Sequence, residues 1–280
     1  MRSLKLRARN RFLIVALGVT GAALLVAIGA ASLYFTRGLA DPFPPPRDPL
    51  LPDLVLPAID DLLVGVDRST GQKTLMFTAT IGNAGDGPLI IRADRRHRFS
   101  SDWRVDQRFL EADGSLSETE TPADLVWGGH GHDHWHVRLG VSYLLETRFG
   151  DKSIVQNIRK AGYCFFDHVQ SDVDPAARTT AHYRKHTCDG YDETSVEMGL
   201  TPGWEDPYYN FLPDQEFDVT NLPDGTYRLK AIADPDRLLR ESNEMNNETW
   251  LDIELTTTAS NPRVRVLRTG PSAGPRARIG

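Results

Sequence analysis

The sequence is poor in cysteine: its 280 residues include only Cys164 and Cys188. Two cysteines exclude a scaffold held together by several disulfides. In an oxidising compartment the two would pair and close a loop around the most polar part of the chain. A thiolate that serves as a metal ligand or a nucleophile is the alternative. We predict the disulfide.

Acidic residues are missing from both ends of the chain. Residues 1–40 and 258–280 contain no Asp or Glu, so residues 41–257 hold all 38 acidic residues but only 21 of the 32 basic ones. The formal charge of that middle part is therefore −17, against −6 for the whole chain. Such a surface argues against nucleic acid as a partner and would attract cations, including amines and Lys-rich proteins. Solubility alone is the alternative explanation for most of these charges.

Charge is also absent from Phe12 to Phe35, an apolar run of 24 residues that follows a basic segment, residues 1–11. The run is long enough for a helix to cross a bilayer. Cleavage at Ala30-Ala31-Ser32, as in a signal peptide, is the alternative, but the site is weak. We predict an uncleaved signal anchor over residues 12–35. The basic segment would stay in the cytoplasm, and the rest of the chain would lie outside the cell membrane.

No long helical pattern and no internal repeat follow residue 36. Residues 36–50 include a proline-rich stretch typical of a stiff, extended linker. Short runs of β-branched and apolar residues with glycine-rich turns then predict one all-β domain over 51–257, an antiparallel β-sandwich. The polar stretches 95–125 and 165–215 are expected to be long loops, the second of which serves a site. The final residues, 258–280, lack periodicity and are predicted to be disordered.

Four of the eight histidines occupy alternate positions in one short stretch, at 130, 132, 134 and 136. Apolar residues at alternate positions follow them, which favours a β-strand. Alternate side chains of a strand share a face, so His132, His134 and His136 can converge on one metal ion. Imidazole suits copper, zinc, iron and nickel, and the spacing does not choose among them. A polar strand edge is the alternative without a ligand.

Several blocks in one order resemble the catalytic domain of the lysyl oxidase family. They are Pro52-Asp-Leu-Val55, His132-Asp-His-Trp-His136, Lys160-Ala-Gly-Tyr-Cys164, the segment 199–208, Asp224-Gly-Thr-Tyr-Arg-Leu229 and the segment 241–247. The resemblance covers about residues 50–256. The chain differs from the animal members in having few cysteines and in the residues just after the histidines. This shortened, anchored form looks like a bacterial-type member.

The resemblance implies a copper-dependent amine oxidase, with His132, His134 and His136 as copper ligands. Its organic cofactor, lysine tyrosylquinone, would form from Lys160 and Tyr208 with copper and dioxygen, and Tyr209 is the adjacent alternative. Primary amines, among them peptidyl lysine, would become aldehydes with release of ammonia and hydrogen peroxide. The general base has no assigned residue. His130 has no family counterpart and could serve as a base, a supporting group or a spare ligand.

The segment Glu241-Ser-Asn-Glu-Met-Asn-Asn247 is rich in the oxygen ligands that calcium prefers. Side chains of Glu241, Asn243, Asn246 and Asn247 could supply several of them. The resemblance adds Asp53 and the carbonyl of Leu54, so that calcium would join the first strand to the last ones. An Asn-rich turn whose side chains cap the backbone is the alternative.

Two other functions fit parts of the sequence. A non-catalytic, calcium-stabilised β-sandwich for surface adhesion would explain the Asp-Gly-Thr-Tyr and Glu-Ser-Asn patterns, but it would not need the histidine strand, Lys160 or Tyr208. A different histidine-bound metal enzyme, such as a zinc hydrolase with an open ligand position, would explain the histidines alone. The amine oxidase accounts for all of these features.

Overall fold

The computed structural model describes residues 48–128, 133–138, 141–148, 154–159, 162–171 and 180–271. All regular structure in these ranges is β, and every paired strand is antiparallel. The predicted all-β, antiparallel class is therefore confirmed for this part of the chain. No helix suited to crossing a bilayer occurs in the described ranges. The predicted anchor, residues 12–35, and the basic segment before it lie outside them.

Strand β3 (Lys73–Asn83) is the centre of a six-stranded sheet. One of its edges pairs with β1 and β2, and the other with β13 and β14, so that Ala79 has Ile59 on one side and Tyr208 on the other. Alternate residues of β3, among them Leu75, Phe77 and Ile81, are fully buried. The other five strands are β1 (Leu54–Val55), β2 (Ile59–Val66), β11 (Val169–Gln170), β13 (Trp204–Tyr208) and β14 (Glu216–Asp218).

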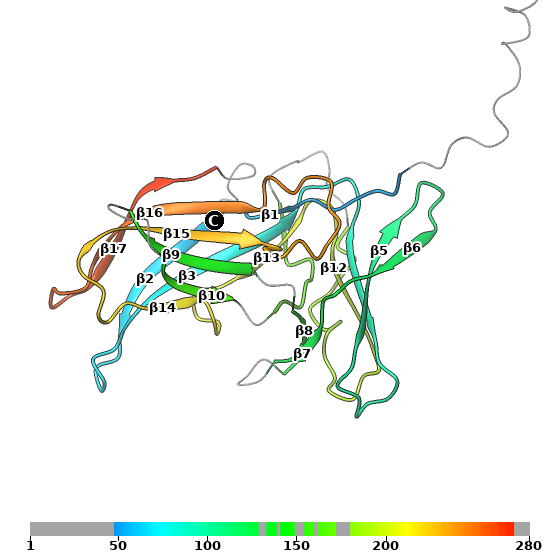
Figure 1. The fold of residues 1–280 in the computed structure, drawn as a ribbon, viewed down its shortest axis with the longest axis horizontal. Helices are drawn as coiled ribbons and strands as arrows, with labels where there is room; N and C mark the ends of the chain where they lie inside the picture. The colour runs from blue at the N-terminus through cyan, green and yellow to red at the C-terminus, as the bar shows by residue number, and fades with distance from the viewer. Residues whose placement is uncertain are drawn as a thin grey trace, which may run out of the picture. The chain divides into compact units, whose positions relative to one another are not determined.

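A five-stranded sheet packs against the first one (Figure 1). Phe77 of β3 meets Tyr143 of β9 edge to face, with ring centroids 4.8 Å apart. This contact lies in the shared apolar core, as expected for a sandwich. In spatial order the strands are β10 (Ile154–Arg159), β9 (Val141–Thr147), β15 (Gly225–Ala233), β16 (Glu248–Thr256) and β17 (Arg263–Thr269).

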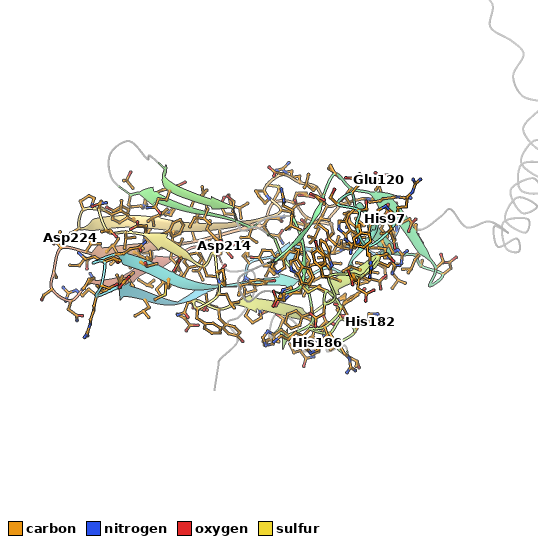
Figure 2. The ribbon with its side chains drawn as sticks, turned by 90° about the horizontal axis from the view of Figure 1, so that it is seen from below. His97, Glu120, His182, His186, Asp214 and Asp224 are labelled. Atoms are coloured by element: carbon orange, nitrogen blue, oxygen red, sulfur yellow. A yellow bond between two sulfur atoms is a disulfide. The ribbon has the colours of Figure 1, made fainter. Side chains whose placement is uncertain are left out.

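Two smaller sheets complete the domain on the right of Figure 1. The first has the order β12 (Ser195–Leu200), β4 (Leu89–Asp94), β5 (Arg104–Leu110) and β6 (Leu116–Glu120). The second pairs β7 (Leu125–Trp127) with β8 (Trp135–Val137), which carries His136 of the predicted metal site and directly follows His134. Asp224 lies at one end of the domain, and His182 and His186 lie toward the other (Figure 2).

Three expectations about irregular stretches are wrong. The stretch 95–125 is not a long loop, because it contains β5, β6 and the start of β7. The stretch 165–215 is not one loop either, because it contains β11, β12 and β13. The stretch 258–280 is not disordered throughout, because 263–269 form β17. Charged side chains pair across the strands in two of these places: Arg108 pairs with Glu118 across β5 and β6, and Arg265 pairs with Glu254 across β16 and β17. Residues 272–280 lie outside the described ranges.

Candidate metal and cofactor site

The two described histidines of the predicted copper site point the same way from β8. Their Nε2 atoms are 2.8 Å apart, and the rings are nearly perpendicular, with centroids separated by 4.5 Å. Trp135, between them in sequence, packs instead against Trp103 and Trp127. The strand thus alternates as predicted over His134 to His136. His132 and His130 lie outside the described residues.

This donor arrangement fits a metal ion. Two imidazole nitrogens 2.8 Å apart form a hydrogen bond, and the same spacing lets both bind one metal ion at the usual bond length of about 2.0–2.1 Å. Among the residues that the structure describes, no group of three or more His, Cys, Asp or Glu side chains is arranged to hold a metal. His132, the third predicted ligand, is not among these residues.

Backbone pairing on both sides holds the histidine strand in place. Val137 exchanges two hydrogen bonds with Tyr163, and His134 forms a bridge with Asp189. The two partner segments are joined by the disulfide between Cys164 and Cys188, which confirms the predicted pairing. The disulfide therefore ties together the segments that bracket the histidines.

Gly162 allows one of these segments to approach closely. A β-carbon added at this position would lie 2.6 Å from the carbonyl oxygen of Val137 and 2.8 Å from Cβ of His136. Real β-carbons do not reach such distances, so only glycine fits beside the histidine strand.

Tyr208, the predicted cofactor tyrosine, ends β13 and is only 6% exposed. Its hydroxyl accepts a hydrogen bond from the backbone N–H of Cys164 (3.2 Å), and its ring packs against Tyr163 at 4.2 Å between centroids. Burial, followed by the negative charge of Asp206, raises the pKa of Tyr208 well above its usual value. The side chain is thus held as a neutral phenol beside the disulfide. Tyr209, its neighbour, stacks instead on Phe211.

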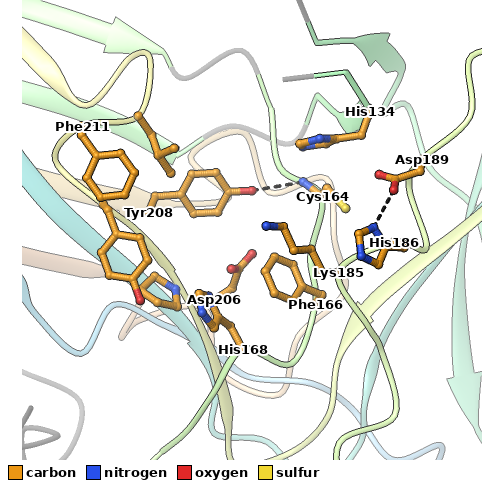
Figure 3. Close-up of a pocket in the computed structure, with 13 residues that line it drawn as sticks. His134, Cys164, Phe166, His168, Lys185, His186, Asp189, Asp206, Tyr208 and Phe211 are labelled. Carbon is orange, nitrogen blue, oxygen red and sulfur yellow. Dashed lines mark hydrogen bonds and ion pairs between the residues drawn. The ribbon is translucent and has the colours of Figure 1, made fainter. Parts of the chain in front are cut away.

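A pocket of about 440 Å³ brings Tyr208 and His134 together (Figure 3). Its volume is in the range of small-molecule sites. Cys164 also lines it, as does the hydrogen-bonded pair of His186 and Asp189, whose Nδ1 and Oδ2 atoms are 2.7 Å apart. Lys160, the predicted partner of Tyr208, lies outside the described residues.

Several pocket residues were not singled out from the sequence, among them Asp206 and Lys185. Asp206 stands two residues before Tyr208 in a resembling block, which was the only signal for it. For His168 the sequence offers no signal beyond its place in the polar stretch 165–215. It lines the pocket, and burial together with the charge of Lys185 lowers its pKa. Its neighbour Asp167 has a structural task instead, since its carboxylate accepts hydrogen bonds from the backbone of His182, Tyr183 and Thr201.

The residues predicted to bind calcium gather at the end of β1. The Leu54 N–H and the amide of Asn247 both donate to Glu241, and the amide of Asn246 donates to both carboxylate oxygens of Asp53. Burial raises the pKa of Glu241 to about 8. Asn243 is exposed, and its side chain caps the backbone of Met245.

Unsatisfied oxygens make this loop fit a hard cation. Asn247 is 7% exposed, and its Oδ1 has no hydrogen-bond partner among the described residues, as is also true of Oδ1 of Asn246 and Oε2 of Glu244. A buried oxygen without a partner is costly, and calcium ligation removes that cost. Asp53, Leu54, Glu241, Asn246 and Asn247 are thus brought together, whereas Asn243 is turned to the backbone.

The model of one protein family, Lysyl oxidase, matches residues 120–264. The chain belongs to the lysyl oxidase family. The matched range includes the histidine strand, Lys160, Tyr208 and the segment 241–247, whereas Asp53 precedes it. The family resemblance expected from the sequence is therefore confirmed.

Curated relatives agree with this assignment. The chain is 31% identical over 133 residues to protein-lysine 6-oxidase of Gallus gallus, which is 46% of this chain and 28% of the relative. It is 27% identical over 189 residues to protein-lysine 6-oxidase of Homo sapiens, and this match covers 66% of this chain and 42% of the relative. It is 30% identical over 134 residues to lysyl oxidase homolog 1 of Homo sapiens, and this match covers 47% of this chain and 21% of the relative. The chain thus spans less than half the length of these relatives.

Proposed function

We propose that this lysyl oxidase family member is a copper-dependent amine oxidase that converts primary amines to aldehydes, ammonia and hydrogen peroxide with dioxygen. One observation carries the proposal: Tyr208 and His134 line the same pocket although they are 74 positions apart in the sequence. An adhesion module has no need for that arrangement.

In this proposal His132, His134 and His136 hold copper, and Lys160 joins Tyr208 in lysine tyrosylquinone. When formed, the copper and quinone pair supplies the electron acceptor that amino-acid side chains lack. The protein supplies position and shielding. Tyr208 is fixed by Tyr163 and by the Cys164 N–H, and it stands at the buried side of the pocket.

Asp206 places a negative charge beside this tyrosine. The residue is 1% exposed, lines the pocket, and raises the pKa of Tyr208 through its charge. A carboxylate in that position would attract the ammonium group of an amine substrate toward Tyr208. The acidic charge of residues 41–257 would favour the approach of such cations from solution.

Replacement of the two adjacent tyrosines tests the cofactor. After copper loading in air, Tyr208→Phe should give no quinone stain and no amine-dependent peroxide but should keep bound copper. Tyr209→Phe is the matched control and should keep the stain and the peroxide. Lys160→Arg should behave like Tyr208→Phe, and peptide mapping of the wild type should find a cross-linked pair. A Tyr208→Phe protein that still stains and oxidises amines would refute the assignment.

We propose further that calcium binds between Asp53, the Leu54 carbonyl, Glu241, Asn243, Asn246 and Asn247. The unpartnered oxygens of Asn246 and Asn247 support this role. Calcium would join β1 to the segment before β16. Because Asn243 caps Met245, it would have to turn toward the ion to serve as a ligand.

We propose also that residues 12–35 anchor the protein as a single-pass membrane protein, with the catalytic domain outside the cell. The uncharged run and the basic segment before it support this location. The substrate would then be an extracellular primary amine, which includes lysine side chains of Lys-rich proteins.

A further inference from the structure

One wall of the pocket is a row of four aromatic rings. Phe166 stacks on His168 at 5.1 Å, His168 meets Tyr209 edge to face at 5.8 Å, and Tyr209 stacks on Phe211 at 5.5 Å. All four line the pocket that also holds Tyr208 and His134 (Figure 3). The row connects the loop after Cys164 with the loop after β13.

Folding does not account for this row. None of the four rings belongs to the buried core, and Phe211 is 75% exposed. A phenylalanine left in water contributes little of the stabilisation that a buried one gives. Exposed aromatic side chains that line a pocket are typical of a ligand surface.

The charges of the pocket indicate how a ligand would lie in it. Asp206, which is almost fully buried, is the negative group next to Tyr208. Lys185 adds a positive charge to the lining, and Phe211 is open to solvent. An amine with one ammonium group and an apolar far end fits these features.

We propose that the four rings bind the aromatic ring of arylalkyl primary amines, of which 2-phenylethylamine is the simplest probe, with the amino group directed toward Tyr208. This rests on the proposed amine oxidase function and adds its substrate class. Aromatic pairs prefer stacked or edge-to-face contacts, and the row offers both to an incoming ring. An n-butylamine chain would bury apolar surface but would gain no ring contact.

Phe211→Ala tests the ring contact, because this exposed residue can be truncated without loss of core packing. Aromatic pairs contribute about 0.5–1.5 kcal/mol, or roughly two- to twelve-fold in affinity. The variant should therefore raise KM for 2-phenylethylamine by roughly that factor more than it raises KM for n-butylamine. Phe211→Tyr should restore the preference. Phe99→Ala, which removes a ring that is 78% exposed and is not among the pocket residues, should change nothing.

A binding measurement separates this inference from the oxidase proposal. Metal-free protein should bind 2-phenylethanol, which has no amine to oxidise, more tightly than n-butanol, and Phe211→Ala should remove the difference. Ring binding without peroxide from any amine would refute the oxidase and leave the ring site standing. Peroxide formation with equal KM for the two amines, or an unchanged preference in Phe211→Ala, would overturn the ring site and leave the oxidase.

Discussion

At the scale of single residues, the close approach of two imidazoles leads to a metal-binding prediction. His134→Ala removes one of two nitrogens that face each other at 2.8 Å. Copper bound per chain, measured by elemental analysis after dialysis, should fall well below one equivalent. His97→Ala is the control, since His97 packs beside Phe99 and is not among the pocket residues. Full copper retention in His134→Ala would contradict the site.

Gly162 provides a test of the support behind His136. Gly162→Ala should shift the histidine strand and weaken copper binding, because the new methyl group would overlap the Val137 carbonyl and Cβ of His136. Overpacking of this kind destabilises by about 1–3 kcal/mol. Gly225→Ala is the control, because its β-carbon would have no neighbour nearer than 3.8 Å. Equal copper affinity and melting temperature in both variants would show that the contact is unimportant.

Calcium should raise the melting temperature, since its proposed site joins residues far apart in sequence. At a calcium concentration about 100 times Kd the gain would be about 2.7 kcal/mol. Calorimetry of the wild type with calcium and with a chelator should show this shift, and Asn246→Ala should reduce it. The same melting temperature in all these samples would mean that no ion is bound there.

At the scale of strands, Asp252 of β16 links three neighbours. Its carboxylate pairs with Arg228 of β15, Arg268 of β17 and Arg148 just after β9. Burial would raise the pKa of Asp252, but hydrogen bonds from Arg228 and Arg268 outweigh burial and lower the pKa to about 2. Because the folded state favours the ionised form, the group stabilises the fold above pH 3.8, the usual value. That stabilisation is lost as the pH falls toward 2.

Asp252→Asn should therefore lower the free energy of unfolding by roughly 2–3 kcal/mol at pH 7. The difference from the wild type should shrink as the pH falls below 4, which urea unfolding at several pH values would reveal. Glu254→Gln on the same strand is the control. Its carboxylate pairs with the exposed Arg265, so its effect should stay under about 1 kcal/mol. A constant difference across this pH range would contradict the role of the charge.

The sequence could reveal which side chains of the histidine strand share a face. It placed His134 and His136 on one face, because that depends only on the extended backbone. It could not reveal β6, in which all five residues are exposed. Strand β17 was within reach of the sequence, because Arg and Val alternate over 263–266. The pocket wall was beyond reach, since Phe166 and Phe211 reach the same pocket through loops whose path depends on β13 and the disulfide.

At the scale of the whole molecule, the disulfide joins two segments that are 24 positions apart. Loop closure of this length stabilises by about 3 kcal/mol in the chain-entropy estimate. Replacing both cysteines with alanine should lower stability by about that amount, and copper affinity should fall with it because the two segments bracket the histidine strand. Denaturant unfolding and copper titration of the double variant would check this. Undiminished copper affinity would show that the strand needs no such support.

The disulfide between Cys164 and Cys188 also bears on where in the cell the protein can become active. In a reducing cytoplasm thiols stay unpaired, so a newly made chain would lack the bond that secures the segments around its histidines. We expect the proposed oxidase to stay inactive in the cytoplasm. It would generate peroxide only after export, where the bond can form.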